Sequence, residues 1–270
     1  MRTKFVSALM LTLLSFAARA EMKADAPTVL ITGANRGIGL ELARQYAAKN
    51  WNVIATSRRP ADDAGLAELR AIAAKHPQLA IERIDVIDTK MIRAVAEKYR
   101  NQPIDLLINN AAAVEASFQA DMAKAGQTYD KIDFDAALYD FNVSTLGPMR
   151  MAQAFMPNVE RSKQKKIVNV TSLAGSLTRG LPGGIAMNYG SSKAALNKYS
   201  VLLSEQVKPK GVIVALVQPV FIASKAGMEN LKNAAPVDQE IAKLIRIIDT
   251  MGMERSGKIS NFSTGEYDPF

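Results

Sequence analysis

A tyrosine and a lysine four residues apart form the part of the sequence best suited to chemistry. Tyr189 and Lys193 belong to the run Tyr-Gly-Ser-Ser-Lys, which continues in the good helix formers of residues 194–196. Residues i and i+4 of a helix project from one face. An isolated phenol titrates near ~10, and a neighbouring cation favours the phenolate and lowers its pKa. The pair predicts an acid/base centre with Tyr189 as the proton-transfer group, although such pairs are also common on solvated helix faces.

A glycine-rich turn lies between a predicted strand and a predicted helix. Residues 28–32 are apolar and β-rich, and residues 40–48 have helical character. Glycines let the backbone approach a pyrophosphate closely, and a helix N-terminus offers free N–H groups and a positive dipole end. The spacing is G-x-x-x-G-x-G, and the strand and helix on either side favour a dinucleotide site. The candidate cofactor contacts in this turn are Gly33, Asn35, Arg36, Gly37, Ile38 and Gly39.

The end of the second predicted strand, residues 52–56, indicates which dinucleotide binds. An acid at this place holds the ribose hydroxyls of NAD, whereas a cation nearby accommodates the 2′-phosphate of NADP. The sequence has Arg58 and Arg59 here and no acid, and Arg36 adds a cation from the glycine-rich turn. The sequence therefore predicts NADP(H) rather than NAD(H). The alternative is that both arginines after the strand are simply solvated.

The order of the remaining elements predicts the fold. Strands are expected at 79–84, 104–108, 166–170 and 212–217, with helices at 63–75 and 144–157 among the connections. Such alternation predicts a single Rossmann-like α/β domain, with a doubly wound, mostly parallel sheet and helices on both faces. Ligands of these folds gather at the carboxyl ends of the strands. Asp85 follows the third strand there, where it would accept from an adenine amino group or cap the next helix.

Four motifs in order resemble the short-chain dehydrogenase/reductase family over residues 27–270. They are TGANRGIG from residue 32, NNAA from residue 109, NVTS ending at Ser172, and Tyr-x-x-x-Lys from residue 189. The runs GKIS from residue 257 and GEYDPF from residue 265 resemble the C-factor and carbonyl-reductase-like branch. The resemblance implies an NADPH-dependent enzyme that reduces an aldehyde or a ketone by hydride transfer, with the hydride coming from the cofactor.

The resemblance also assigns roles to individual residues. Tyr189 matches the proton donor, and Lys193 matches the residue that binds the nicotinamide ribose and lowers the pKa of the tyrosine. Ser172 matches the hydroxyl that stabilises the substrate oxygen, with Ser176 as a near competitor. Asn142 matches the asparagine that supports a water and proton path behind the lysine, or it only caps the helix that follows. The further cofactor positions expected are Asp85, Val86, Asn109, Ala111, Pro219, Val220 and Ile222.

Three positions depart from the family pattern, all around the expected cofactor. Ala112 stands where the family usually has glycine, so that its methyl group would crowd the backbone or require a negative φ. Pro219-Val220 replaces the usual Pro-Gly, and Ser224 takes the place of a threonine. The segments 115–128 and 223–235 are expected to wall and cover the site, and their apolar residues favour a hydrophobic carbonyl substrate, although core packing explains them equally well.

The first twenty residues have the three regions of a secretory signal. Arg2 and Lys4 precede an apolar run from 5 to 18, and Ala18-Arg19-Ala20 has the small-x-small pattern of a cleavage site. The run is short for a membrane span, which needs about 20 residues. We expect a signal peptide at 1–20, an enzyme domain at 21–270, and a periplasmic location without stable membrane insertion. An uncleaved membrane anchor or a cytoplasmic chain is the alternative.

Composition excludes several classes of protein. The chain has no cysteine and a single histidine, which excludes disulfides, Fe–S clusters and thiol catalysis and disfavours a zinc site. The net charge of +8 falls to +5 without the signal, and no dense basic block indicates nucleic-acid binding apart from residues 161–166, which more simply form a solvated helix end. The expected partner is a small carbonyl or alcohol, with a homodimer left open. The rival function is an exported signalling or nucleotide-binding protein with this fold and little or no turnover.

Overall fold

The computed structural model describes residues 20–113, 129, 131–179, 186–220, 222 and 235–270. Three regions of the sequence analysis fall outside these residues: the signal segment up to residue 19, the segment 115–128, and Ser224 with the cover expected around it. None of the helices in the described ranges has both the length and the apolar character that crossing a membrane requires.

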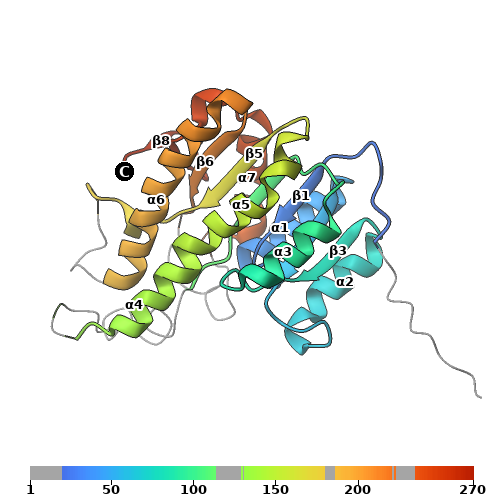
Figure 1. The fold of residues 1–270 in the computed structure, drawn as a ribbon, viewed down its shortest axis with the longest axis horizontal. Coiled ribbons are helices and arrows are strands. Elements are labelled where there is room, and N and C mark those ends of the chain that lie inside the picture. Colours follow the sequence, from blue (N-terminus) through green and yellow to red (C-terminus); the bar gives the residue numbers. More distant parts are fainter. Residues whose placement is uncertain (1–19, 114–128, 130, 180–185, 221, 223–234) are drawn as a thin grey trace, which may run out of the picture.

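The described residues form one sheet of eight strands in the order β3-β2-β1-β4-β5-β6-β7-β8 (Figure 1). All neighbouring pairs are parallel except the last, because β8 runs antiparallel to β7. The predicted doubly wound, mostly parallel sheet is therefore confirmed. In chain order the strands are β1 Thr28–Ile31, β2 Asn52–Ser57, β3 Leu79–Arg83, β4 Leu106–Asn109, β5 Lys166–Val170, β6 Ile213–Gln218, β7 Ile259–Asn261 and β8 Tyr267–Asp268.

Helices cover both faces of the sheet (Figure 1). One face carries α1 (Gly37–Ala48), α2 (Ala67–Lys75) and α7 (Val237–Thr250), and α1 packs on both of its neighbours. The other face carries α3 (Thr89–Lys98), α5 (Gly147–Glu160), α6 (Met187–Val207) and α4 (Phe134–Phe141), which packs on α6. Two hydrophobic clusters, one under each helical layer, make this a single domain.

The central strands are apolar on both faces because both faces are covered. In β1, Val29 and Ile31 join the cluster under α1 while Leu30 joins the cluster under α3 and α5. Successive side chains of a strand point to opposite faces, so a continuous apolar run serves both layers. This explains why the strands were recognisable in the sequence as short apolar runs.

Several element boundaries differ from the predictions, and three of these differences have a plain structural description. The helix expected from 144 begins at Gly147, because Asn142–Leu146 forms a π-helical turn that joins α4 to α5. The helix expected from 63 begins with a 3₁₀ turn capped by Asp63, whose side chain accepts from the Gly65 N–H. The fourth strand begins at Leu106 instead of residue 104. The strands β7 and β8 were not predicted, and they have only three and two residues.

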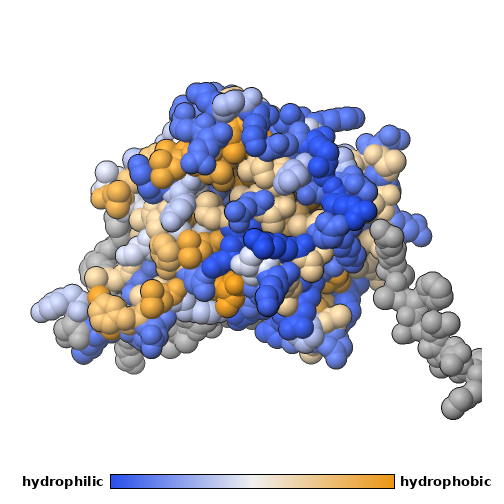
Figure 2. Space-filling view, in the orientation of Figure 1, coloured by the Kyte–Doolittle hydropathy of each residue, from blue (hydrophilic) through white to orange (hydrophobic). Residues whose placement is uncertain are grey.

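The surface over α4 and along α6 carries apolar side chains (Figure 2). Phe134 and Leu138, one turn apart on α4, are 73% and 67% exposed. Tyr199 and Leu202 on α6 are also exposed. Contiguous exposed apolar residues often mark a contact surface.

Candidate active site

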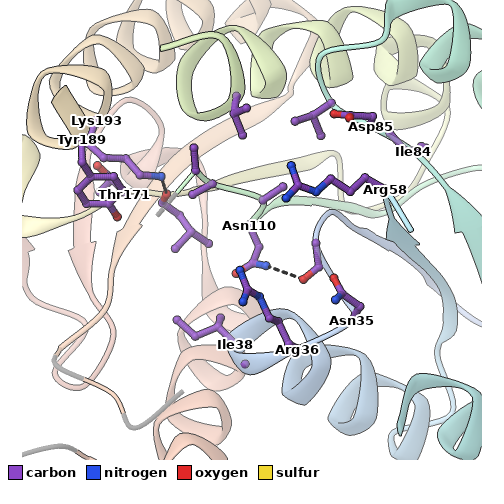
Figure 3. Close-up of a pocket in the computed structure, with 18 of the residues that line it drawn as sticks. Asn35, Arg36, Ile38, Arg58, Ile84, Asp85, Asn110, Thr171, Tyr189 and Lys193 are labelled. Carbon is purple, nitrogen blue, oxygen red and sulfur yellow. Dashed lines mark hydrogen bonds between the residues drawn. The ribbon is translucent and has the colours of Figure 1, made fainter. Parts of the chain in front are cut away.

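A cavity of about 250 Å³ opens at the carboxyl ends of β1–β6 (Figure 3). Its walls come from the turn before α1, the ends of the central strands and the first turns of α6. Parallel strands bring their carboxyl ends to one edge, which explains why residues far apart in sequence meet here. The predicted site residues that line it are Gly33, Asn35, Arg36, Gly37, Ile38, Arg58, Asp85, Val86, Ala111, Tyr189, Lys193 and Pro219.

Six predicted residues do not line the cavity: Gly39, Asn109, Asn142, Ser172, Val220 and Ile222. Val220 and Ile222 pack with the hydrophobic cluster beneath α1 and α7. Asn109 is buried and donates to the Asn169 side chain at 2.8 Å. Their predicted cofactor contacts therefore stay predictions, and the structure gives Asn109 a packing role.

The glycine-rich turn has the backbone that a close approach to phosphate requires. Gly33 and Gly37 have φ values of 68° and 56°, in the region that side-chain-bearing residues rarely adopt. A Cβ on Gly39 would lie 2.3 Å from the Gly33 carbonyl oxygen. The Asn110 amide fixes the turn from below, donating to the carbonyls of Thr32 at 2.9 Å and Gly33 at 3.2 Å. The turn thus forms a close-packed backbone cradle with no room for a side chain at residue 39.

The N-terminus of α1 faces this cradle. Helix α1 begins at Gly37, and the capping residue Arg36 makes no side-chain cap bond. The first N–H groups of a helix have no partner within it and favour an anion. The residues present therefore fit the pyrophosphate of a dinucleotide.

Two arginines line the cavity at the turns that follow β1 and β2, while a third is paired elsewhere. Arg36 and Arg58 both contribute to the wall, and Arg58 points across the cavity (Figure 3). The Arg58 guanidinium donates to the Tyr139 hydroxyl at 2.7 Å. Arg59 instead pairs with Asp63 at 2.9 Å. The sequence left open whether the two arginines bind the cofactor or are simply solvated. Arg58 lines the cavity, whereas Arg59 belongs to a surface ion pair.

Lys193 is held at the centre of the site by burial and one backbone carbonyl. Helix α6 begins at Met187, so that Tyr189 and Lys193 lie in its first two turns. Lys193 is 3% exposed, and its Nζ donates to the Val170 carbonyl at 2.8 Å. Burial lowers the pKa of Lys193 to about 8, because it disfavours the charged form. At neutral pH the ammonium is still the main form, next to the tyrosine.

The pKa of Tyr189 moves in the direction opposite to the prediction. The pKa of Tyr189 is raised to about 12, chiefly by burial; a hydrogen bond with Ser172 partly offsets this increase, and the nearby Asp140 adds to it. The prediction that Lys193 sets a lowered tyrosine pKa is therefore wrong for this structure. The Lys193 Nζ lies 5.7 Å from the centre of the Tyr189 ring and is already bonded to Val170, so desolvation outweighs its charge. A neutral phenol is the form that donates a proton.

The hydrogen-bond partners of Ser172 and Ser176 show which of the two candidate serines lies at the site. The Ser172 side chain makes a hydrogen bond with Tyr189, and its Oγ accepts from the Ala174 N–H at 3.2 Å. The Ser176 Oγ contacts Thr178 and accepts from the Arg179 N–H at 3.0 Å. Ser172 is therefore the serine beside the tyrosine.

Asn142 lies in the π-helical turn between α4 and α5. Its Oδ1 accepts from the Arg150 guanidinium at 2.7 Å, and its carbonyl accepts from the same arginine at 3.2 Å. The structure therefore does not bring the Asn142 side chain to the cavity with Lys193, and its part in a proton path stays a prediction. The capping alternative is also not what the structure shows, because Asp133 caps α4 and the turn continues into α5.

Sequence reasoning missed several lining residues. Asn110, in the Asn-Asn-Ala-Ala run, had a local signal because it adjoins Asn109. Ala112, which the sequence analysis placed near the cofactor and did not miss, lines the cavity and is not among the described residues with positive φ. Tyr139 had no local signal, because only the packing of α4 brings it to the cavity. The others missed are Ile84, Ala113, Val143, Val170 and Thr171.

Comparison with known proteins finds relatives of similar sequence and similar fold. The family described as short chain dehydrogenase matches residues 27–235. The short-chain dehydrogenase srdF of Neurospora crassa is 26% identical over 260 residues, covering 91% of this chain and 98% of the relative. The C-signal of Myxococcus xanthus is 28% identical over 175 residues, covering 65% and 98%. The NADPH-bound carbonyl reductase from chicken fatty liver has 28% identity and a TM-score of 0.80, covering 91% of this chain and 99% of that one.

The family match spans most of the domain and includes the glycine-rich turn and both residues of the Tyr189–Lys193 pair. The named relatives include a short-chain dehydrogenase and a carbonyl reductase of the same overall fold. The chain therefore belongs to the short-chain dehydrogenase family and is an NAD(P)-dependent oxidoreductase acting on alcohol or carbonyl groups.

Proposed function

We propose that the protein reduces an aldehyde or a ketone with NADPH, using Tyr189 as the proton donor. The observation that carries this proposal is the half-buried Tyr189 phenol, which lines the cavity together with Lys193, is hydrogen-bonded to Ser172, and has the Lys193 Nζ 5.7 Å from its ring centre. The similarity to the NADPH-bound chicken carbonyl reductase supports the same reaction class.

Two cavity arginines support the choice of NADPH over NADH. Arg36 and Arg58 border the adenosine side, and the end of β2 carries no acid that would hold unphosphorylated ribose hydroxyls. Guanidinium groups bind phosphate in a fork-like geometry. The glycine-rich turn and the N-terminus of α1 would hold the pyrophosphate, and Lys193 the nicotinamide ribose. When bound there, the cofactor supplies the hydride.

The residues of the chain then handle the proton and the developing charge. As the carbonyl carbon receives the hydride, the Tyr189 O–H gives its proton to the carbonyl oxygen and becomes a phenolate. The Ser172 hydroxyl donates to the same oxygen and stabilises the charge that develops on it. The Lys193 ammonium stays bonded to the Val170 carbonyl next to the tyrosine ring, and the phenolate regains a proton before the next turnover.

Binding and turnover test this proposal in two steps. Residues 21–270 are titrated with NADPH and with NADH, and aldehydes and ketones are then screened by following NADPH consumption. Tight binding that prefers NADPH, with turnover of at least one carbonyl class, is expected. Equal affinity for both cofactors would refute the cofactor assignment.

A second candidate function rests on the similarity to the C-signal of Myxococcus xanthus. In this alternative the protein binds a nucleotide and acts as an exported signal with little turnover. Saturable NADPH binding without consumption over a broad carbonyl panel would favour it. The complete Tyr189, Lys193 and Ser172 arrangement favours the enzyme, since binding alone does not need a proton donor.

Export and self-association complete the proposal. The charged, apolar and small-x-small regions of residues 1–20 support a cleaved signal and a periplasmic enzyme. Mass measurement of the mature chain, together with cell fractionation, tests this, since a full-length cytosolic chain would contradict it. The apolar side chains over α4 and α6 support a homodimer, and sedimentation of the Leu138→Glu variant tests it.

A further inference from the structure

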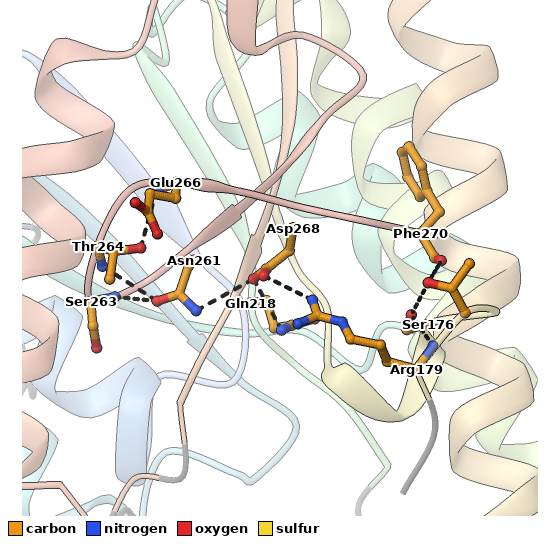
Figure 4. A network of polar contacts seen from close by, with 10 residues as sticks. Ser176, Arg179, Gln218, Asn261, Ser263, Thr264, Glu266, Asp268 and Phe270 are labelled. Atoms are coloured by element: carbon orange, nitrogen blue, oxygen red, sulfur yellow. Dashed lines mark hydrogen bonds and ion pairs between the residues drawn. The ribbon is translucent and has the colours of Figure 1, made fainter.

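The β7–β8 hairpin, residues 259–268, lies outside the part of the chain that matches the family. Its side chains form a polar network with Gln218 and Arg179 (Figure 4). Two antiparallel pairings form the hairpin, Ile259 with Asp268 and Ser260 with Tyr267. Arg255 fastens the hairpin, donating to the Ser260 hydroxyl at 2.9 Å and stacking over the Tyr267 ring at 4.8 Å. The hairpin is therefore a fixed platform.

One carboxylate on this platform joins two separate segments. The Asp268 Oδ1 accepts from the Arg179 guanidinium at 2.9 Å, and its Oδ2 accepts from the Gln218 amide at 3.1 Å. Asn261 of β7 also approaches Oδ2, at 3.4 Å. The Asp268 side chain is only 12% exposed, so this ion pair is shielded from solvent more than an ordinary surface pair.

The first of the two segments follows Ser172. Its near part is fixed to α6, because Asn197 donates to the Gly175 carbonyl at 3.2 Å and a Cβ on Gly175 would lie 2.7 Å from that of Lys193. Its far part is fixed by the chain after β8. Thr178 donates to the Phe270 carbonyl through both its N–H, at 3.2 Å, and its hydroxyl, at 3.0 Å. Arg179 adds the ion pair to Asp268.

The second segment begins at the end of β6. Gln218 is the last residue of that strand and is 5% exposed, and Pro219, which follows it, lines the cavity. A buried amide that loses its acceptor is costly to leave unpaired. Removing the Asp268 carboxylate would therefore disturb both the serine side and the Pro219 side of the cavity.

We propose that Asp268 is a positioning residue for the carbonyl substrate, holding the segment after Ser172 and the segment at Pro219 in register on two sides of the Tyr189 site. This inference rests on the proposed carbonyl reduction. The adenosine contacts at Arg36 and Arg58 lie at the other end of the cavity, on the turns that follow β1 and β2. Asp268 therefore leaves the phosphate contacts unchanged and reaches the expected cofactor site only through Pro219, so that its main effect is on substrate binding.

The test compares Asp268→Asn and Arg179→Gln with a matched control, Glu82→Gln. The Lys98–Glu82 pair has side-chain exposures of 50% and 12%, close to the 47% and 12% of Arg179 and Asp268. For a carbonyl that the enzyme turns over, we expect KM to rise about 10-fold in both test variants, as for loss of a charge-assisted hydrogen bond. The dissociation constant of NADPH should change less than about 2-fold, because no phosphate contact is altered. Asp268→Glu, which keeps the charge, should recover most of the loss.

Hydrogen exchange provides a readout that does not depend on turnover. The amides of residues 173–179 should exchange faster in Asp268→Asn than in the wild type. Their exchange rate in Glu82→Gln should equal that of the wild type. An unchanged KM in Arg179→Gln, equal losses of substrate and NADPH affinity, or unchanged exchange in this segment would each overturn the proposal. A wild-type protein that reduces no carbonyl would refute the proposed function, while the exchange measurement would still decide whether Asp268 holds the segment.

Discussion

The two ends of the cavity differ in whether the backbone or the side chains form the binding groups. At the nucleotide end the backbone shapes the site. Gly33 and Gly37 have positive φ, and a Cβ at residue 39 would clash with the Gly33 carbonyl. The charges there, Arg36 and Arg58, are at the surface of the cavity. At the catalytic end the working groups are side chains, the half-buried Tyr189 bonded to a serine and the buried Lys193 bonded to a carbonyl.

This difference decides how each end uses charge. The exposed arginines at the nucleotide end are available to a charged ligand. Burial at the catalytic end moves the pKa of Lys193 down to about 8 and that of Tyr189 up to about 12. Cofactor binding and proton transfer should therefore be separable by mutation.

The sharpest separation is expected from Tyr189→Phe. The change removes the proton donor and leaves the glycine-rich turn and both cavity arginines intact, so kcat should fall about 1,000-fold. The dissociation constant of NADPH should stay within about 3-fold, because the ring itself is retained. Single-turnover kinetics and equilibrium titration measure the two quantities. Normal turnover in the variant would remove Tyr189 from the mechanism.

Lys193→Met should reveal the energetic cost of burying a cation at the catalytic end. The pKa of Lys193 is lowered in the folded protein, so the unfolded chain binds more protons between pH 8 and 10, and stability rises with pH in that window. The shift corresponds to about 3 kcal/mol across the full window up to the unfolded pKa. The variant should lack this rise.

Urea unfolding at several pH values from 7 to 10 measures the difference between the two chains. The window ends at pH 10 because the raised pKa of Tyr189 makes stability fall with pH above that point. Lys166, whose pKa burial also lowers, contributes equally to both chains and cancels in the difference. Parallel pH profiles for the wild type and the variant would show that Lys193 is not desolvated as the structure has it.

The same contrast explains what the sequence could and could not predict. The nucleotide end was predictable because its determinants are local, a strand, a glycine-rich turn and a helix in succession. The strands β1–β6 were predictable because burial on both faces makes them apolar runs, whereas β7 and β8 are too short to carry a pattern. The direction of the Tyr189 pKa was not predictable, since it depends on how deeply other elements bury the phenol.

Residues that reach the site only through tertiary packing had no signal in the sequence. Tyr139 comes from α4, and its contact with Arg58 joins positions 81 residues apart. Asp268 meets Arg179 and Gln218 only because β8 folds back on β7. Asn142 illustrates the converse, because a motif match suggested a site role while the π-helical turn directs its side chain to Arg150.

Gly39→Ala tests the backbone character of the nucleotide end. The added methyl would lie 2.3 Å from the Gly33 carbonyl and 2.6 Å from the Asn110 amide, so the turn must open. We expect NADPH affinity to fall about 100-fold, since the close approach to the pyrophosphate is lost. Gly211→Ala is the control, because Gly211 also has a constrained backbone but has no atom within 4 Å of the added Cβ. The control should lose some stability and no affinity.

Arg58→Ser should produce the smallest effect and bears most directly on cofactor choice. Loss of one charge-assisted phosphate contact should weaken NADPH about 10-fold and NADH about 2-fold or less. Arg59→Ser is the matched control, because Arg59 is paired with Asp63 and does not line the cavity. Titration of both variants with both cofactors gives four ratios to compare. Equal losses for NADPH and NADH in Arg58→Ser would mean that the exposed charge at the end of β2 does not read the 2′-phosphate, and Arg36 alone would have to carry that discrimination.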